Sequence, residues 1–194
     1  MDFRLEDRPR LLSESMDRES DRGCVLLGAE MLSNDLEFLL RAFFRTEPSI
    51  VKKTINPLFK GFSPLATFAA RIELAYAMGL IPKVVQVRLH LVRELRNLFA
   101  HTATHLDLSD PKCKPILDKL AGTSKDFPSA QETSEMTFGK QKLTKREFKD
   151  RLAFLLVISR VSTIMEFLEV RLSSGHDARR DVLAFEKNRT FEDV

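Results

Sequence analysis

The feature that most constrains the fold of this chain is an apolar segment between Pro82 and Phe99. Its apolar residues recur mostly at three-to-four spacing: Val84, Val85, Val87, Leu89, Leu91, Val92, Leu95, Leu98 and Phe99. This spacing predicts an α-helix with only narrow polar faces, and such a helix lies near the middle of a domain. Pro82 suits the helix start, and we expect the helix to end near His101.

Other parts of the chain repeat the same helical spacing. A long amphipathic helix is predicted from about Met16 to Phe44, and Pro48 prevents it from continuing. A capping-box sequence at residues 144–147 precedes a further apolar series, which predicts another long helix to about Leu168. These amphipathic helices predict a helical bundle, because each must bury its apolar face against another element.

Shorter elements are predicted between the long helices. A serine and a proline at residues 63–64 predict a helix start, and Gly79 suits the C-terminal cap of that helix. An Asp-Pro pair at residues 110–111 predicts a short helix to about Leu120. Residues 56–64 are rich in turn formers, so we expect an ordered loop there with apolar anchors. The expected anchors are Leu58, Phe59 and Phe62.

The composition agrees with an all-α fold and a single-domain helical bundle built on long amphipathic helices. Seven glycines are few for 194 residues, and the apolar residues are mostly Leu, Ala, Phe and Met, which favour helices. We predict an N-terminal arm at 1–15, a helical domain at 16–174 and a charged C-terminal tail at 175–194. A mobile loop is expected at about 122–143 within the domain.

Charge and cysteine content exclude several classes of protein. The 31 basic and 28 acidic residues give a net charge of +3, too small to indicate a dedicated nucleic-acid binder. Cys24 and Cys113 have no metal-type or redox-type spacing, so we predict two buried or partly buried free thiols, no metal site and no cofactor. The N-terminus is charged, and no run approaches the roughly 18 apolar residues of a membrane span. We therefore expect a cytoplasmic protein without membrane contact.

A helix-turn-helix is a competing interpretation of residues 66–92. Gly79 would lie in the turn, and Lys83, Gln86 and Arg88 would read bases. The second helix is too apolar on the faces that a recognition helix leaves exposed, so direct DNA binding is disfavoured. Most of the 15 Phe and the one Tyr fall on apolar stripes, which predicts core positions rather than base stacking.

The polar residues at the end of the central helix are candidates for chemistry. Arg93, Asn97 and His101 are four residues apart and share one stripe, with Arg96 about 100° around the helix from Asn97. Histidine can transfer a proton near neutral pH, and arginine matches phosphate oxygens. RNA cleavage without a metal needs these groups: His101 would move the proton. Arg96 and Arg93 would bind the phosphate, and Asn97 would orient the other groups.

The same residues also have a structural interpretation. Cations near the C-terminus of a helix are favoured by the helix dipole whatever their function. A basic residue and a histidine five positions apart are also common on helices. On spacing alone, hydrogen bonding or capping of the helix end is the more frequent role for such a group.

The helix end also resembles a known signature. The stretch Arg-Glu-Leu-Arg-Asn-Leu-Phe-Ala-His at residues 93–101 is similar to the Arg-Asn-x-x-x-His signature of HEPN domains. These are helical dimerising modules, and they include metal-independent ribonucleases of toxin and phage-defence systems. The resemblance implies RNA as a partner and catalytic roles for Arg96, Asn97 and His101.

A wider resemblance covers roughly residues 16–172. The segments that carry it are residues 19–23, which enter the first long helix, the loop at 56–65 and the helix at 71–81. The loop contains a Gly-x-x-Pro-Leu motif, and the helix contains an Arg-Ile-x-Leu-Ala-Tyr-x-x-Gly motif. These segments resemble the mannitol operon repressor family, MtlR. The resemblance implies an all-helical, dimeric regulator that has no recognised DNA-binding motif and acts through a protein partner. This chain departs from the family in its intact HEPN-like signature and its charged tail.

Two functional hypotheses follow from these resemblances. The first is a bacterial transcriptional regulator of the MtlR type, a homodimer working through protein contacts. The second is a HEPN-like metal-independent endoribonuclease, so the sequence leaves open whether the chain is an enzyme. The ribonuclease hypothesis predicts that Arg96 and His101 are exposed and face a groove, whereas the regulator hypothesis permits both to be buried.

Overall fold

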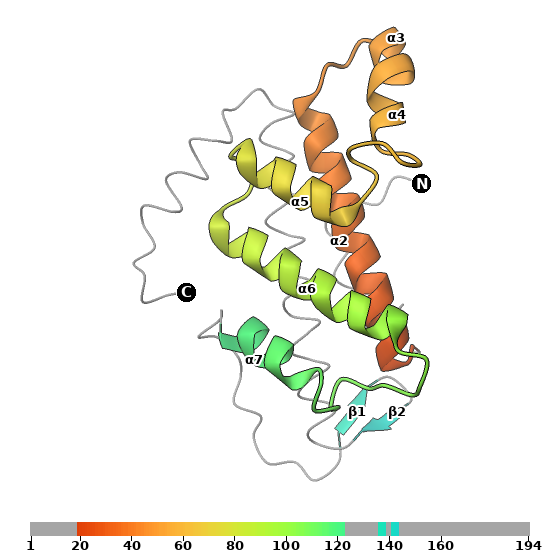
Figure 1. Ribbon diagram of the computed structural model, residues 1–194, viewed down its shortest axis with the longest axis vertical. Coiled ribbons are helices and arrows are strands. Elements are labelled where there is room, and N and C mark those ends of the chain that lie inside the picture. The colour runs from red at the N-terminus through yellow and green to blue at the C-terminus, as the bar shows by residue number, and fades with distance from the viewer. Residues whose placement is uncertain (1–18, 123–135, 139–140, 144–194) are drawn as a thin grey trace.

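The computed structural model describes residues 19–122, 136–138 and 141–143 (Figure 1). The longer helices are α2 (Asp21–Phe43), α5 (Phe68–Ala77) and α6 (Lys83–His101), and α7 (Lys114–Gly122) follows α6. Between α2 and α5 lie α3 (Pro48–Ile50), the π-helical turn η1 (Val51–Ile55) and α4 (Asn56–Leu58). Strands β1 (Met136–Phe138) and β2 (Gln141–Leu143) pair antiparallel, with Thr137 opposite Lys142. The all-α fold predicted from the sequence is confirmed, with this small hairpin added.

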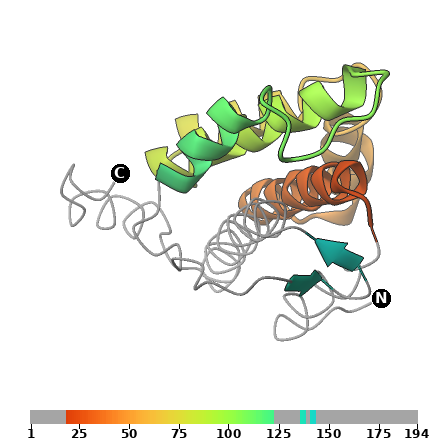
Figure 2. The same cartoon turned by 90° about the horizontal axis from the view of Figure 1, so that it is seen from below.

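The described helices form two layers. Helices α5, α6 and α7 lie side by side in one layer, and α2 runs beneath them (Figures 1 and 2). Helix α2 contacts both α5 and α6, and α6 also contacts α5 and α7. The central helix of the sequence therefore occupies the middle of its layer and packs on three other helices.

The apolar face of α6 is buried as its spacing predicted. The side chains with no exposed surface are Val85, Leu89, Val92, Leu95 and Phe99. Among the predicted core positions, Val87 is 37% exposed and Leu98 is half-buried. Pro82 is the N-cap of the helix and His101 its last residue, so both predicted ends are confirmed.

Two polar residues of α6 are buried with the apolar ones. Gln86 and Arg88 are only 6% and 4% exposed. The amide of Gln86 donates from Nε2 to Oε2 of Glu73 on α5 at 3.0 Å, and its Oε1 accepts from Lys83 Nζ at 2.8 Å. Because DNA readout needs exposed side chains, this burial argues against the helix-turn-helix interpretation.

Helix α5 begins later than the Ser-Pro pair at residues 63–64 predicted. Its N-cap is Thr67, whose Oγ1 accepts a hydrogen bond from the amide of Ala70 at 3.2 Å. The buried Leu65 explains the delay, because its amide donates to the carbonyl of Leu58 at 2.9 Å and holds the chain in a loop. The predicted C-terminal cap is confirmed, since Gly79 has a φ of +68°, a value that favours glycine.

Two other helix starts also differ from the sequence prediction. Helix α2 begins at Asp21 rather than near Met16, and Ser20 caps it by accepting from the amide of Gly23 at 3.2 Å. The Asp-Pro pair at residues 110–111 forms a turn before α7, because Asp110 Oδ1 accepts from the amide of Lys112 at 2.9 Å. In both places a local side-chain hydrogen bond fixes where the helix begins.

Not every phenylalanine predicted to lie in the core is there. Phe59 is buried and Leu58 is half-buried, as expected for anchors of the loop. Phe62, the third predicted anchor, is fully exposed, and Phe38 on α2 is 48% exposed. Gly61, with a φ of +63°, makes the tight turn that directs Phe62 away from the core.

The cysteines agree with the sequence prediction. Cys24 and Cys113 are both buried free thiols.

Within the described ranges, no group of three or more His, Cys, Asp and Glu residues could hold a metal ion. A separate search of the same residues finds no helix that is both long and apolar enough to cross a membrane. The predicted arm, the helix after residue 144 and the charged tail lie outside the described residues.

Truncating the buried face of α6 should destabilise the protein strongly. Leu95→Ala or Phe99→Ala removes a completely buried side chain and should lower the free energy of unfolding by about 2 to 5 kcal/mol. The neighbouring Glu94→Ala, on the exposed side of the same helix, is the matched control and should change it little. Denaturant titration measures all three variants. Unchanged stability in both truncations would contradict the packing of α6.

Candidate functional site

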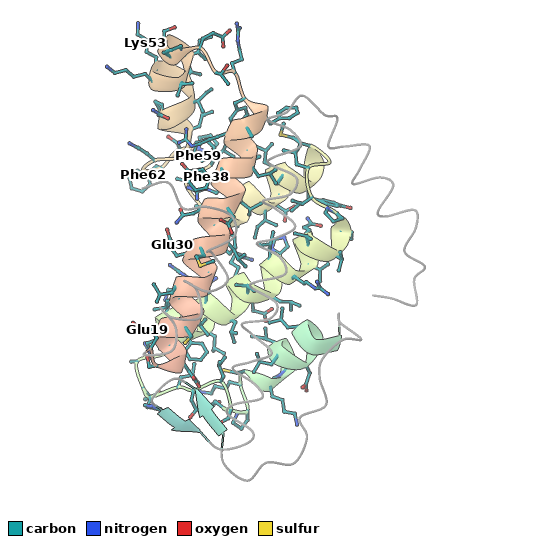
Figure 3. All side chains as sticks on the ribbon, turned by 180° about the vertical axis from the view of Figure 1, so that it is seen from behind. Glu19, Glu30, Phe38, Lys53, Phe59 and Phe62 are labelled. Carbon is teal, nitrogen blue, oxygen red and sulfur yellow. The ribbon has the colours of Figure 1, made fainter. Side chains whose placement is uncertain are left out.

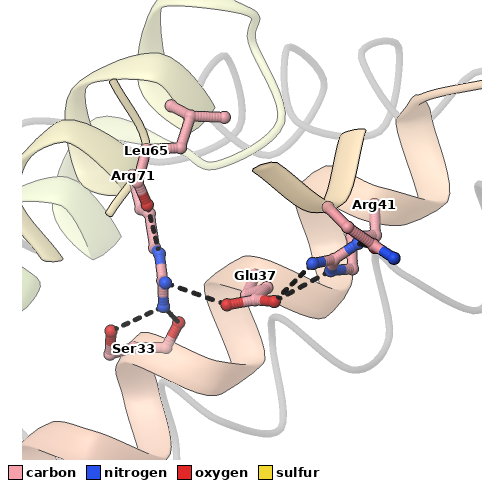
Figure 4. A network of polar contacts seen from close by, with 6 residues as sticks. Ser33, Glu37, Arg41, Leu65 and Arg71 are labelled. Carbon is pink, nitrogen blue, oxygen red and sulfur yellow. Dashed lines mark hydrogen bonds and ion pairs between the residues drawn. The ribbon is translucent and has the colours of Figure 1, made fainter. Parts of the chain in front are cut away.

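A buried arginine organises the loop between α4 and α5 (Figure 4). Arg71 on α5 is 7% exposed, and its Nε donates to the carbonyl of Leu65 in the loop at 2.8 Å. Its Nη1 donates to the carbonyl and the Oγ of Ser33 on α2, at 3.1 and 3.0 Å. Its Nη2 forms an ion pair with Glu37 Oε2 at 2.9 Å. One guanidinium thus joins the loop, α5 and α2.

The aromatic ring of Phe59 lies beside this network. The guanidinium carbons of Arg41 and Arg71 lie 4.3 and 5.4 Å from the centre of the ring. Arg41 also donates from Nε to Glu37 Oε1 at 2.9 Å and from Nη1 to Asn56 Oδ1 at 2.8 Å. Charge, hydrogen bonds and cation–π contact therefore act together to fix the loop on α2.

A second polar cluster holds the chain where it leaves α6. Arg22 Nη2 donates to the carbonyls of Thr102 and Thr104, at 2.8 and 3.1 Å. Asp21 Oδ2 accepts from the amide of Leu108 at 2.8 Å. The first turn of α2 thereby fixes the end of α6, where the candidate residues of the sequence lie.

The structure brings three of the four candidate residues to one cavity. A cavity of about 370 Å³ lies where α2, α6 and the start of α5 meet. Helix α6 contributes Arg93, Arg96 and Asn97 to its lining. His101, one turn further along α6, is exposed and is not among the described residues that line the cavity.

The candidate residues do not cap α6. Thr102 does so, since its amide and its Oγ1 both donate to the carbonyl of Leu98, at 3.1 and 2.7 Å. Arg96 Nη1 donates instead to Asn97 Oδ1 at 3.2 Å. His101 is the basic residue in the last turn of α6, where the helix dipole favours a cation.

The described residues alone do not assemble a complete proton-transfer site. Arg96 is exposed at the cavity as the ribonuclease hypothesis requires, but His101 lies outside the described lining. Within the part of the chain that the structure describes, His101 also has no hydrogen-bond partner that would orient it. A general acid or base needs such positioning relative to the phosphate that the arginines would bind.

The cavity also includes residues that the sequence analysis did not single out. Glu30 and Ser33 of α2 and residues 66–69 at the start of α5 contribute to its lining. Thr67 carried a usable signal, because a threonine before an apolar run is a helix N-cap candidate. The sequence prediction followed the Ser-Pro pair at residues 63–64 instead of Thr67, and therefore placed the helix start too early. The contribution of Glu30 depends on how α2 crosses α6, which no local pattern encodes.

Comparison with known proteins identifies the fold. A chain of the X-ray structure of the MtlR-HPr complex from Escherichia coli matches with a TM-score of 0.65 and 18% sequence identity, covering 81% of this chain and 97% of that chain. The described helices thus have the fold of a bacterial MtlR protein. The model of the mannitol repressor family, MtlR, matches residues 10–166, and the chain belongs to this family. The wider of the two resemblances seen in the sequence is confirmed.

Curated relatives agree with this assignment. The mannitol operon repressors of Escherichia coli strain K12 and of Escherichia coli O6:H1 strain CFT073 are each 26% identical to this chain over 89 residues. The matched stretch is 46% of this chain and 46% of the length of those relatives. It therefore spans less than half of each repressor.

Replacing Arg71 by methionine should destabilise the fold. Arg71→Met keeps the apolar stem but leaves Glu37 and the Ser33 carbonyl without their buried partner, which should cost about 3 kcal/mol. Arg45→Met is the matched control, because it removes an exposed ion pair with Glu47 and should change stability little. Thermal and denaturant unfolding measure both variants. Equal stability of the two variants would show that the buried network contributes nothing.

The position of His101 predicts the outcome of an RNA cleavage assay. Purified protein incubated with RNA in excess chelator should leave the RNA intact, and His101→Ala should behave in the same way. A parallel sample with an added metal-independent ribonuclease shows that the RNA can be cleaved. Cleavage by the wild type that is lost in His101→Ala would instead establish the ribonuclease hypothesis.

Proposed function

We propose that this chain is a bacterial regulatory protein that acts on transcription by binding a protein partner, in the manner of the mannitol repressor family. The observation that carries the proposal is the likeness, over 81% of the chain, to a protein whose structure was solved in complex with HPr. The family match over residues 10–166 supports the regulatory role. The proposal includes a homodimer, as the family resemblance implies, and a location in the cytoplasm.

The proposed partner is an HPr-type protein rather than DNA. The burial of Gln86 and Arg88 removes two of the three side chains that a recognition helix would have used. The exposed surface offers apolar side chains instead. Those of large size that are exposed in the described part are Leu27, Phe38, Phe62 and Val87.

Phe62 is the exposed residue best suited to contact a partner. Its side chain is fully exposed, although its loop is fixed by the buried Phe59 and by Arg71. The fixed loop therefore buries Phe59 and leaves Phe62 exposed; both side chains are labelled in Figure 3. A large aromatic on a fixed loop can be buried by a partner with little loss of backbone entropy. Phe38 on α2 is a second phenylalanine with a largely exposed side chain, at 48%.

Calorimetric titration with HPr from the same bacterium tests the proposal. The wild type should bind saturably, and Phe62→Ser should bind at least about tenfold more weakly, equivalent to about 1.4 kcal/mol. Phe62→Leu keeps an apolar side chain and is the matched control, with binding close to that of the wild type. Both variants should keep the wild-type stability, because residue 62 is exposed.

The two possible failures of this titration mean different things. Absence of binding by the wild type would contradict an HPr-type partner. Binding that is equally strong in Phe62→Ser would leave the partner established and show that the contact surface lies elsewhere.

A further inference from the structure

We propose that the cavity between α2, α6 and the start of α5 binds the oxyanion group, a phosphate or a carboxylate, of a small molecule. The site is distinct from the exposed Phe62 and does not depend on the proposed protein partner. Its volume of about 370 Å³ lies in the range of small-molecule sites.

Arg93 is the first cationic side chain of the cavity lining. Its Nε is buried, and no hydrogen-bond acceptor for it is present in the part of the chain that the structure describes. A buried donor without a partner is costly, and the cost is greater when the group carries a charge. A guanidinium has donors and no acceptor, so a ligand bound beside Arg93 must supply acceptor atoms.

Arg96 provides a second guanidinium at the same cavity. It follows Arg93 by three residues on α6, so the two side chains lie on neighbouring positions of one helix face. The hydrogen bond from Arg96 Nη1 to Asn97 Oδ1 at 3.2 Å is long and leaves the other donors of Arg96 available. Each planar guanidinium can donate two parallel hydrogen bonds to the oxygens of a phosphate or carboxylate.

The start of α5 adds backbone donors to the cavity wall. Thr67 Oγ1 accepts from the amide of Ala70, whereas the preceding amides of Phe68 and Ala69 have no acceptor within the helix. Both residues line the cavity. The positive end of the helix dipole therefore faces the same space as the two arginines.

Glu30, the one acidic residue in the described lining of the cavity, favours a small ligand over a nucleic acid. Glu30 lines the cavity and is exposed, and within the described ranges no ion pair joins it to Arg93 or Arg96. Its carboxylate repels any anion, so the oxyanion must bind at the arginines and away from Glu30, a placement that the successive phosphates of RNA could not all adopt. Glu30 can accept hydrogen bonds from hydroxyl groups of a small molecule. Arg71, at the same wall, is already paired with Glu37.

A nuclear magnetic resonance titration with inorganic phosphate tests the proposal, and a second titration with acetate distinguishes the two head groups. The ionic strength is kept constant with chloride. We expect saturable shifts of the Arg93 Nε–H resonance and of the Phe68 and Ala69 amide resonances. Tighter binding of phosphate would assign a phosphate group to the small molecule, and tighter binding of acetate would assign a carboxylate. Arg96→Gln should weaken binding at least about tenfold, equivalent to about 1.4 kcal/mol. Lys119→Gln, an exposed position on α7, makes the matched charge change and should leave binding within twofold.

Several results would overturn the proposal. No saturable shift with either anion would do so, as would equal affinities of Arg96→Gln and Lys119→Gln. A short RNA that shifts the same resonances when neither small anion does would assign the site to RNA. If Arg96→Gln fails to fold, Arg96→Lys keeps the charge without the fork and should still bind more weakly than the wild type.

Discussion

The described structure depends most on the guanidinium of Arg71. From α5 it donates to the carbonyl of Leu65 in the loop. It also binds Ser33 and the carboxylate of Glu37, both on α2. Without it, the chain between α4 and α5 has little that would hold it on α2 besides Phe59 and Leu65. Because this loop ends at Thr67, the same contact sets where α5 begins and where its free amides lie. Formation of the cavity follows from this placement, because residues 66–69 line it.

The sequence segments that resemble the mannitol repressor family now have physical roles. Asp21 and Arg22 hold the chain that leaves α6, and the loop and helix segments supply Phe59, Leu65 and Arg71 to one network. These residues fix the relative positions of α2, α5 and α6. The resemblance is therefore one of architecture, which explains why the family and fold matches agree although the identity to the solved relative is only 18%.

Helical periodicity predicted the fold well because it reports burial directly. The ends of α6, the cap at Gly79 and the buried cysteines were all predicted correctly. The start of α5 was not, since the hydrogen bond between Leu65 and Leu58 overrides the local Ser-Pro signal. At the site, spacing grouped Arg93, Arg96, Asn97 and His101 but could not show that the cavity lining includes the first three and not His101. That depends on the crossing of α2 and on the start of α5, which are tertiary features.

Amide hydrogen exchange measures most directly whether Arg71 holds the loop. The amide of Leu65, bonded to the carbonyl of Leu58 at 2.9 Å, should be well protected in the wild type. In Arg71→Lys, which keeps the charge but not the fork, it should exchange much faster, while the amide of Leu95 in the buried face of α6 keeps its protection. Unchanged protection of Leu65 in Arg71→Lys would contradict the account, because the loop would then be held by other contacts.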